Sequence, residues 1–122
     1  MLTSGGKVDA DTALLEAEHG DPRKAVAIGR RAWKAAPSVR AADGLGWALT
    51  QAGRPRAGLD WGRRALRLGT RDPYFLYHAG MSALAAGEPD LARRYLRRAL
   101  ADNARFSPLH APRARRALRR LG

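Results

Sequence analysis

The fold class that this sequence predicts is all-α: a solenoid of three helical hairpins followed by a C-terminal capping helix, with seven helices and no strand. Residues 45–68 recur 34 residues later as residues 79–102, and a weaker copy lies 33 residues upstream. A repeat of this period is typical of stacked helical hairpins, each of which packs only on its neighbours.

A Gly-x-Pro trio interrupts each predicted hairpin near its middle. Glycine tolerates the left-handed backbone that ends many helices, and proline has its φ angle already fixed near the helical value. Each trio therefore predicts a tight turn between two antiparallel helices, and Gly20 in particular suits a left-handed C-terminal cap. The trios are Gly20-Asp21-Pro22, Gly53-Arg54-Pro55 and Gly87-Glu88-Pro89.

The first hairpin is predicted to occupy residues 9–37. Residues 1–8 show no periodic pattern, and we expect them to be disordered or derived from cloning. Asp9 or Asp11 can cap the first helix, and Asp21-Pro22 begins the second.

The second and third hairpins are predicted at residues 38–71 and 72–104. Ser38 can cap the first helix of one, and Asp72-Pro73 begins the other. Small residues recur at matching positions of both hairpins, and we expect two helix backbones to approach closely there. These residues are Gly46, Ala65, Gly80 and Ala99.

The last predicted element is a capping helix within residues 105–122. Pro112 is expected to begin it, and the helix then runs from Arg113 to Leu121. Four apolar residues form one narrow stripe along this helix, and arginines fill most of the remaining surface. A terminal helix with one polar face is suited to cover the open end of a solenoid. The stripe consists of Ala114, Ala117, Leu118 and Leu121.

The repeats resemble the tetratricopeptide repeat (TPR) family, whose pattern begins Trp-x-x-Leu-Gly-x-x-Tyr and continues with spaced Ala and Phe and a closing proline. Leu45-Gly46 and Ala79-Gly80 stand at its Leu-Gly step, whereas most of its large aromatic positions hold other residues. The resemblance covers about residues 9–104. It implies a right-handed superhelix whose concave groove, lined by the first helix of each hairpin, binds a peptide or helix of a partner.

One TPR subclass grips acidic chaperone C-termini with Lys and Asn side chains on the first helices. The matching positions here include Leu14, Asp43, Trp47 and Tyr77, so we reject a chaperone tail as the ligand. The function that the resemblance implies is that of a non-enzymatic scaffold for protein binding. The identity of its partner stays open.

Aromatic and polar residues on the first helices are the candidate partner-binding residues. Tyr74, Tyr77 and Met81 share one helix face, and Trp47 precedes Met81 by one repeat. Aromatic residues beside a few polar groups are typical of binding hot spots. The alternative is that these residues pack against one another, the upstream hairpin or the capping helix. The candidates are Arg40, Asp43, Trp47, Gln51, Tyr74, Tyr77, His78 and Met81.

The chain is strongly basic, with 23 Lys and Arg against 11 Asp and Glu and a formal net charge of +12. Such a field favours acidic partners, which include nucleic acid, an acidic protein and an anionic membrane surface. The alternative is the Arg- and Ala-rich, Lys-poor composition of a high-GC genome, which indicates a bacterial protein.

Nine arginines on the second helices form an alternative binding face for nucleic acid or another acidic polymer. They would hold phosphates without reading bases. Trp61 and Tyr95 are the candidates for stacking bases, but both fall at helix-packing positions. A solvated surface is therefore favoured, and nucleic acid is the less favoured partner. The nine are Arg30, Arg31, Arg63, Arg64, Arg67, Arg93, Arg94, Arg97 and Arg98.

The sequence carries no recognisable catalytic, cofactor-binding or metal-binding motif. It contains no cysteine, which excludes disulfides, thiolate ligands and thiol nucleophiles. His19, His78 and His110 fit no ligand spacing. We therefore expect no enzyme activity and no cofactor.

The N-terminal region gives expectations about the cellular location of the protein and about its association with further repeats or a second copy. It lacks the apolar stretch of a signal peptide, and no apolar run approaches the length of about 18 residues that spans a membrane. We expect a cytoplasmic protein, or an exported one if a longer parent has lost its signal. Ala13 and Leu14 would face solvent on an uncapped first helix, which predicts either preceding repeats or self-association.

Overall fold

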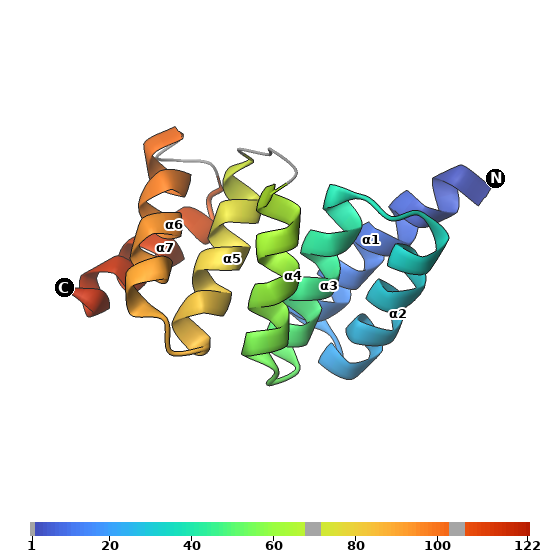
Figure 1. The fold of residues 1–122 in the computed structure, drawn as a ribbon, viewed down its shortest axis with the longest axis horizontal. Helices are drawn as coiled ribbons and strands as arrows, with labels where there is room; N and C mark the ends of the chain where they lie inside the picture. Colours follow the sequence, from blue (N-terminus) through green and yellow to red (C-terminus); the bar gives the residue numbers. More distant parts are fainter. Residues whose placement is uncertain (1, 68–71, 103–106) are drawn as a thin grey trace.

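The computed structural model describes residues 2–67, 72–102 and 107–122. Within them it contains seven α-helices and no strand, stacked in a row from one end of the molecule to the other (Figure 1). This confirms the predicted all-α solenoid. The helices are α1 (Leu2–His19), α2 (Pro22–Ala35), α3 (Val39–Gln51), α4 (Pro55–Arg67), α5 (Pro73–Ala85), α6 (Pro89–Asp102) and α7 (His110–Leu121).

Contacts between the described helices divide them into two layers. The inner layer consists of α1, α3 and α5, in which each helix contacts the next, and α5 also contacts α7. The outer layer consists of α2, α4 and α6, whose backbones approach those of their neighbours along the chain but not one another. The inner helices therefore lie closer together than the outer ones, and the stack curves with the inner layer on its concave side.

The hairpin turns at Gly53 and Gly87 have the predicted left-handed geometry, with φ angles of 83° and 79°. Glycine adopts this conformation without the steric cost that a Cβ brings. After each glycine, the next N–H donates to a carbonyl five residues earlier, as from Arg54 to Leu49 at 2.9 Å. These bonds satisfy carbonyl groups that the end of a helix leaves unpaired.

The first hairpin turns differently, and the prediction of a left-handed cap at Gly20 is wrong. The φ angle of Gly20 is not positive. Its N–H continues the helical pattern by donating to the Glu16 carbonyl at 2.8 Å. The chain leaves the helical conformation at Asp21, which is extended, and its carboxylate caps α2 by accepting from the Arg23 N–H at 3.0 Å.

The predicted cap at Ser38 is confirmed, and Asp72, predicted only to begin a hairpin, also caps its helix. The hydroxyl of Ser38 accepts from the Ala41 N–H at 3.0 Å at the start of α3. The carboxylate of Asp72 accepts from the Tyr74 N–H at 2.9 Å at the start of α5. Each side chain satisfies one of the N–H groups that have no partner inside the first turn.

Two helices begin earlier than predicted. α1 begins at Leu2 rather than near Asp9, so residues 2–8, expected to lie outside the fold, belong to a helix. Glycine lowers helix propensity by about 1 kcal/mol relative to alanine but, unlike proline, keeps the N–H that the helix needs. The predicted repeat boundaries at residues 71 and 104 lie outside the described residues.

α7 begins at His110, two residues before the predicted start at Pro112. The Ser107 hydroxyl accepts from the N–H groups of Leu109 at 3.2 Å and His110 at 3.1 Å, and thereby provides the acceptor for a helix start. Pro112 then lies in the first turn, where its missing N–H costs no hydrogen bond. Ala114 and Ala117 are buried and α7 contacts α5 and α6, which confirms its role as a cap.

Close packing of α3 on α4 depends on glycine at both helices. A Cβ added to Gly58 would lie 2.6 Å from the Gly46 carbonyl oxygen, and one added to Gly46 would lie 2.8 Å from the Gly58 carbonyl oxygen. Both distances are well below van der Waals contact, so backbone meets backbone here. The predicted close approach at Gly46 is confirmed.

The N-terminal face of α1 is better covered than the sequence predicted. Ala13 is fully buried and Leu14 packs against the core, because α1 contacts both α2 and α3. The apolar side chain that faces solvent is instead Leu15, at 64% exposure. No described helix has both the length and the apolar character needed to cross a membrane.

We expect Gly58→Ala to destabilise the fold by about 1–3 kcal/mol, because the new methyl group overpacks a backbone contact that can relax only if α3 and α4 separate. Gly62→Ala on the same helix is the matched control, since its Cβ would lie 3.3 Å from the Ala79 Cβ and meet no backbone oxygen. Urea denaturation followed by circular dichroism measures both. Equal midpoints for the two variants would contradict the backbone-contact interpretation.

Candidate functional site

Four of the eight predicted binding residues lie inside the protein. Asp43, Trp47, Tyr77 and His78 are each less than a tenth exposed, so they offer a partner almost no surface. The alternative interpretation, packing against the upstream hairpin and the capping helix, is the correct one for these four. They belong to the helices of the concave side, as expected, but their side chains are part of the core.

The polar atoms of this buried cluster largely satisfy one another. Nδ1 of His78 lies 2.9 Å from Oδ1 of Asp43. The His78 ring stacks on Trp47, with centroids 4.6 Å apart and an interplanar angle of 25°. Because a carboxylate can only accept, an ionised Asp43 requires the proton on Nδ1 of His78. The cluster therefore joins α3 to α5 as a polar element of the core.

Glu18 links this cluster to both ends of the chain. Its Oε1 accepts a hydrogen bond of 2.8 Å from Nε1 of Trp47 and lies 3.4 Å from Nε2 of His110. Its Oε2 lies 3.5 Å from a guanidinium nitrogen of Arg113. The sequence analysis missed Glu18, although a carboxylate in the last turn of a helix, next to the negative end of its dipole, signals a specific partner.

The start of α7 fits against the same region. Nδ1 of His110 lies 3.0 Å from the Ser107 hydroxyl, and the His110 ring lies 4.8 Å from that of Tyr77 between centroids. Burial raises the pKa of Tyr77, an effect that a hydrogen bond with Arg113 opposes. α7 therefore covers the end of the concave side and leaves less of it open than the TPR resemblance implied.

The other four predicted residues remain at or near the surface. Arg40, Gln51 and Tyr74 are exposed and Met81 is half-buried. Arg40 pairs with Asp11 at 2.9 Å, each side chain being half exposed. An exposed pair of this kind contributes at most about 1 kcal/mol.

An open pocket of about 260 Å³, which we call the inner pocket, lies beside the buried cluster. Most of its wall is apolar, and Leu15 at 64% exposure and Tyr74 at 39% are the large apolar side chains at its surface. Acidic groups of Asp11 and Glu18 lie among them. Its lining residues are Asp11, Leu14, Leu15, Glu18, His19, Tyr74, His78 and His110.

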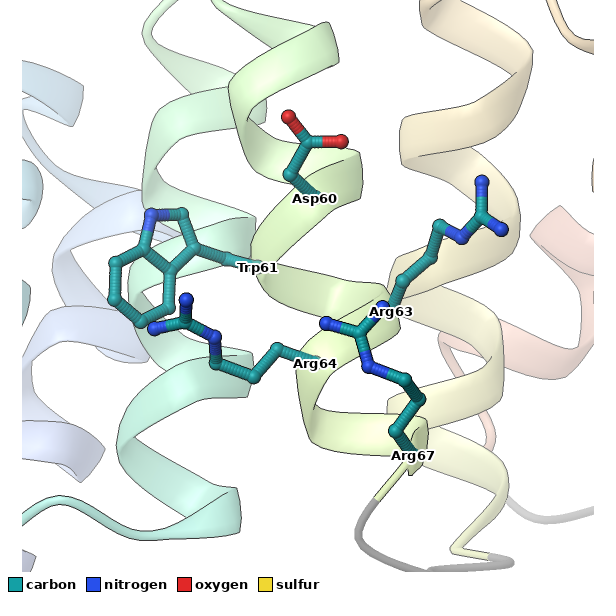
Figure 2. Close-up of a pocket in the computed structure, with 5 residues that line it drawn as sticks. All are labelled: Asp60, Trp61, Arg63, Arg64 and Arg67. Atoms are coloured by element: carbon teal, nitrogen blue, oxygen red, sulfur yellow. The ribbon is translucent and has the colours of Figure 1, made fainter.

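The outer layer carries a different surface, formed by two adjoining cavities that we call the outer basic groove. The first cavity, of about 300 Å³, is lined by Asp60, Trp61, Arg63, Arg64 and Arg67 (Figure 2). The second, of about 510 Å³, is lined by Arg63, Leu91, Arg94, Tyr95, Arg97 and Arg98. Arg63 belongs to both, and Figure 2 shows it extending to the opposite side of α4 from Trp61.

Aromatic packing holds one arginine of this groove in place. Trp33 of α2 and Trp61 of α4 meet edge to face, with centroids 4.9 Å apart. The guanidinium carbon of Arg64 lies 4.5 Å from the centroid of Trp61 and 5.5 Å from that of Trp33. This cation–π geometry favours one orientation of the guanidinium group.

The predicted arginine face is confirmed as a surface for most of its members but not for Arg93. Arg93 is half-buried and donates to Asp90 at 2.7 Å and to the Leu121 carbonyl at 2.9 Å, so it ties α6 to α7. Arg30 and Arg31 are exposed but line neither cavity. The remaining six predicted arginines line the outer basic groove.

Within the described residues, no three His, Asp or Glu side chains are arranged to hold a metal ion. Comparison with known proteins gives no assignment: no protein-family model matches the chain, and no curated protein matches it.

We expect the fold to lose stability as the pH falls through 6.5, in part because of His110. Burial lowers the pKa of His110 below its ordinary value of 6.5, an effect that nearby Glu18 opposes and His78 and Arg113 reinforce. Between the folded pKa and 6.5 the unfolded chain binds more protons, so stability decreases with acidification in this window and then levels off.

Urea midpoints at pH 7.5 and 5.5 measure this effect in the wild type and in His110→Gln, whose side chain does not titrate. We expect the variant to lose less stability on acidification. The two proteins share every other titratable group, so the difference between their losses isolates the contribution of His110. The same loss in both proteins would show that His110 does not contribute.

Proposed function

We propose that this protein is a non-enzymatic protein-interaction module of the TPR type that binds a partner segment at the inner pocket. The observation that carries the proposal is the presence of exposed Leu15 and Tyr74 in one mostly apolar lining, next to a buried cluster most of whose polar atoms have partners inside the protein. Contact between water and an apolar wall is unfavourable, so the free energy falls when an apolar side chain of a partner displaces that water.

The size of the inner pocket indicates which kind of ligand can occupy it. Ligand pockets for small molecules usually exceed about 300 Å³ and enclose most of the ligand. The inner pocket has about 260 Å³ and is open, so it suits one inserted side chain of a peptide or helix. Tyr74 supplies the rigid aromatic surface that often dominates binding energy at interfaces.

The charge around the pocket favours a basic partner. Residues 1–22 contain five acidic residues and one lysine, although the whole chain is strongly basic. Asp11 and Glu18 lie in the pocket wall and pair with Arg40 and Arg113. The acids of this segment still outnumber Lys7 and these two arginines, so the charge around the pocket stays negative. We therefore propose a partner segment in which Lys or Arg flanks the inserted apolar side chain.

The resemblance to the TPR family supports the same proposal, since that family binds peptides or helices on the side lined by the first helices. The pocket lies on that side, between α1, α5 and the start of α7. It differs in place from the predicted groove, because Trp47 and Tyr77 are buried and the binding surface moves to Leu15 and Tyr74.

Selection of a displayed library of random 12-residue peptides on the immobilised protein tests the proposal. We expect the selected peptides to share an apolar residue flanked by Lys or Arg. We expect Leu15→Glu to weaken their binding at least about tenfold, because it removes a hot-spot contact and places a charge in an apolar pocket.

Leu109→Glu is the matched control, since Leu109 is also exposed, at 41%, but does not line the pocket. Its binding should equal that of the wild type. Peptides without a common apolar position, or peptides that bind Leu15→Glu as tightly as the wild type, would overturn the proposal.

A further inference from the structure

The outer basic groove combines a high positive charge with few acids. Its six arginines form no ion pair within the described parts of the chain, although Arg56, Arg93 and Arg113 elsewhere do. Asp60 is the acid in its lining, and Figure 2 shows its side chain directed away from Arg64 and Arg67. Like charges held this close repel one another, so an anion that enters the groove relieves repulsion as well as gaining attraction.

The guanidinium group of Arg64 is held in an orientation that suits binding of an oxyanion. Its guanidinium group rests on Trp61 at 4.5 Å, which holds the group in one plane. A guanidinium fixed by its face still has N–H groups along its edges, and these match two oxygens of a phosphate or carboxylate at once. Less side-chain entropy is then lost on binding than for a freely rotating arginine.

The arrangement of the groove fits a polymer better than an isolated anion. Arg63-Arg64 of α4 and Arg97-Arg98 of α6 occupy matching positions one repeat apart, and Arg63 connects the two cavities. Basic groups are therefore repeated at the spacing of the outer helices. A chain with regularly spaced negative charges can contact both pairs, whereas a single small anion contacts one.

Aromatic surface distinguishes among acidic polymers. Tyr95 is half-buried in the wall of the second cavity, among Arg94, Arg97 and Arg98. Unpaired bases stack on such side chains irrespective of sequence, whereas an acidic peptide gains nothing comparable from them. Bases in a duplex are already stacked, so this surface favours a single strand.

From these observations we propose that the outer basic groove binds single-stranded nucleic acid without sequence preference. Arg63, Arg64, Arg97 and Arg98 hold backbone phosphates, and Tyr95 stacks a base. This site is separate from the inner pocket, because it lies on α4 and α6 whereas the inner pocket lies on α1, α5 and the start of α7. The proposal does not depend on the function proposed for that pocket.

The first test is the anisotropy of a fluorescent 20-nucleotide oligo(dT) titrated with the full chain at several salt concentrations. We expect a dissociation constant of about 1–100 µM near physiological salt. Contacts with about four to six phosphates predict a loss of roughly 50- to 300-fold in affinity between 50 and 200 mM salt. No binding at 50 mM salt would overturn the proposal.

Two charge-reversal variants locate the site. Arg63→Glu/Arg64→Glu should weaken oligo(dT) binding at least about 30-fold. Arg119→Glu/Arg120→Glu changes the net charge equally at exposed positions of α7 that line neither cavity, and it should weaken binding less than about fivefold. Equal losses in the two variants would show a general charge effect and no site. Circular dichroism confirms that both variants fold.

Competitors identify the class of polymer. Single-stranded oligo(dT) should compete at least about tenfold better than polyglutamate or a 20-base-pair duplex of equal strand length. Tyr95→Leu should weaken oligo(dT) binding about fivefold or more and leave polyglutamate unchanged. Stronger competition by polyglutamate would favour an acidic protein and overturn the proposal, as would stronger competition by the duplex.

Discussion

The carboxylate of Glu18 decides how much of the concave side remains open. It extends from the last turn of α1 and meets Trp47 of α3 together with His110 and Arg113 of α7. Three segments that are far apart in the sequence thus converge on two oxygen atoms with little solvent around them. A partly buried carboxylate needs such partners, since without them its desolvation would be unfavourable.

Convergence on Glu18 has a consequence for binding. With α7 packed on α5 and joined to α1 through Glu18, Trp47 and Tyr77 of the inner layer become core, and Asp43 and His78 pair with each other beside them. What remains accessible on that side is the edge, where Leu15 and Tyr74 border the inner pocket. The inner pocket therefore adjoins the buried cluster that stabilises the fold, and His78 and Glu18 belong to both.

The charges of the chain are unevenly distributed over the stack. Acidic residues concentrate near the N-terminus and contribute Asp11 and Glu18 to the inner pocket, whereas arginines without an ion pair in the described part of the chain line the groove on α4 and α6. The backbones of the outer helices do not approach one another in the described residues, and arginine and aromatic side chains line the cavities between them. The stack thus offers an apolar pocket with two acids between α1 and α5 on its inner side, arginines of α7 further along that side, and a basic groove on α4 and α6.

The sequence by itself determined the number and order of the helices and the turns at Gly53 and Gly87, because these depend on local rules: glycine at positive φ, proline at a helix start and small residues where backbones meet. It also placed the arginines on the outer helices. Only the tertiary structure decided which aromatic residues are buried, since that depends on α7 reaching Glu18 of α1. Helical periodicity shows which side chains share a face, but whether a distant helix covers that face depends on contacts across the whole stack.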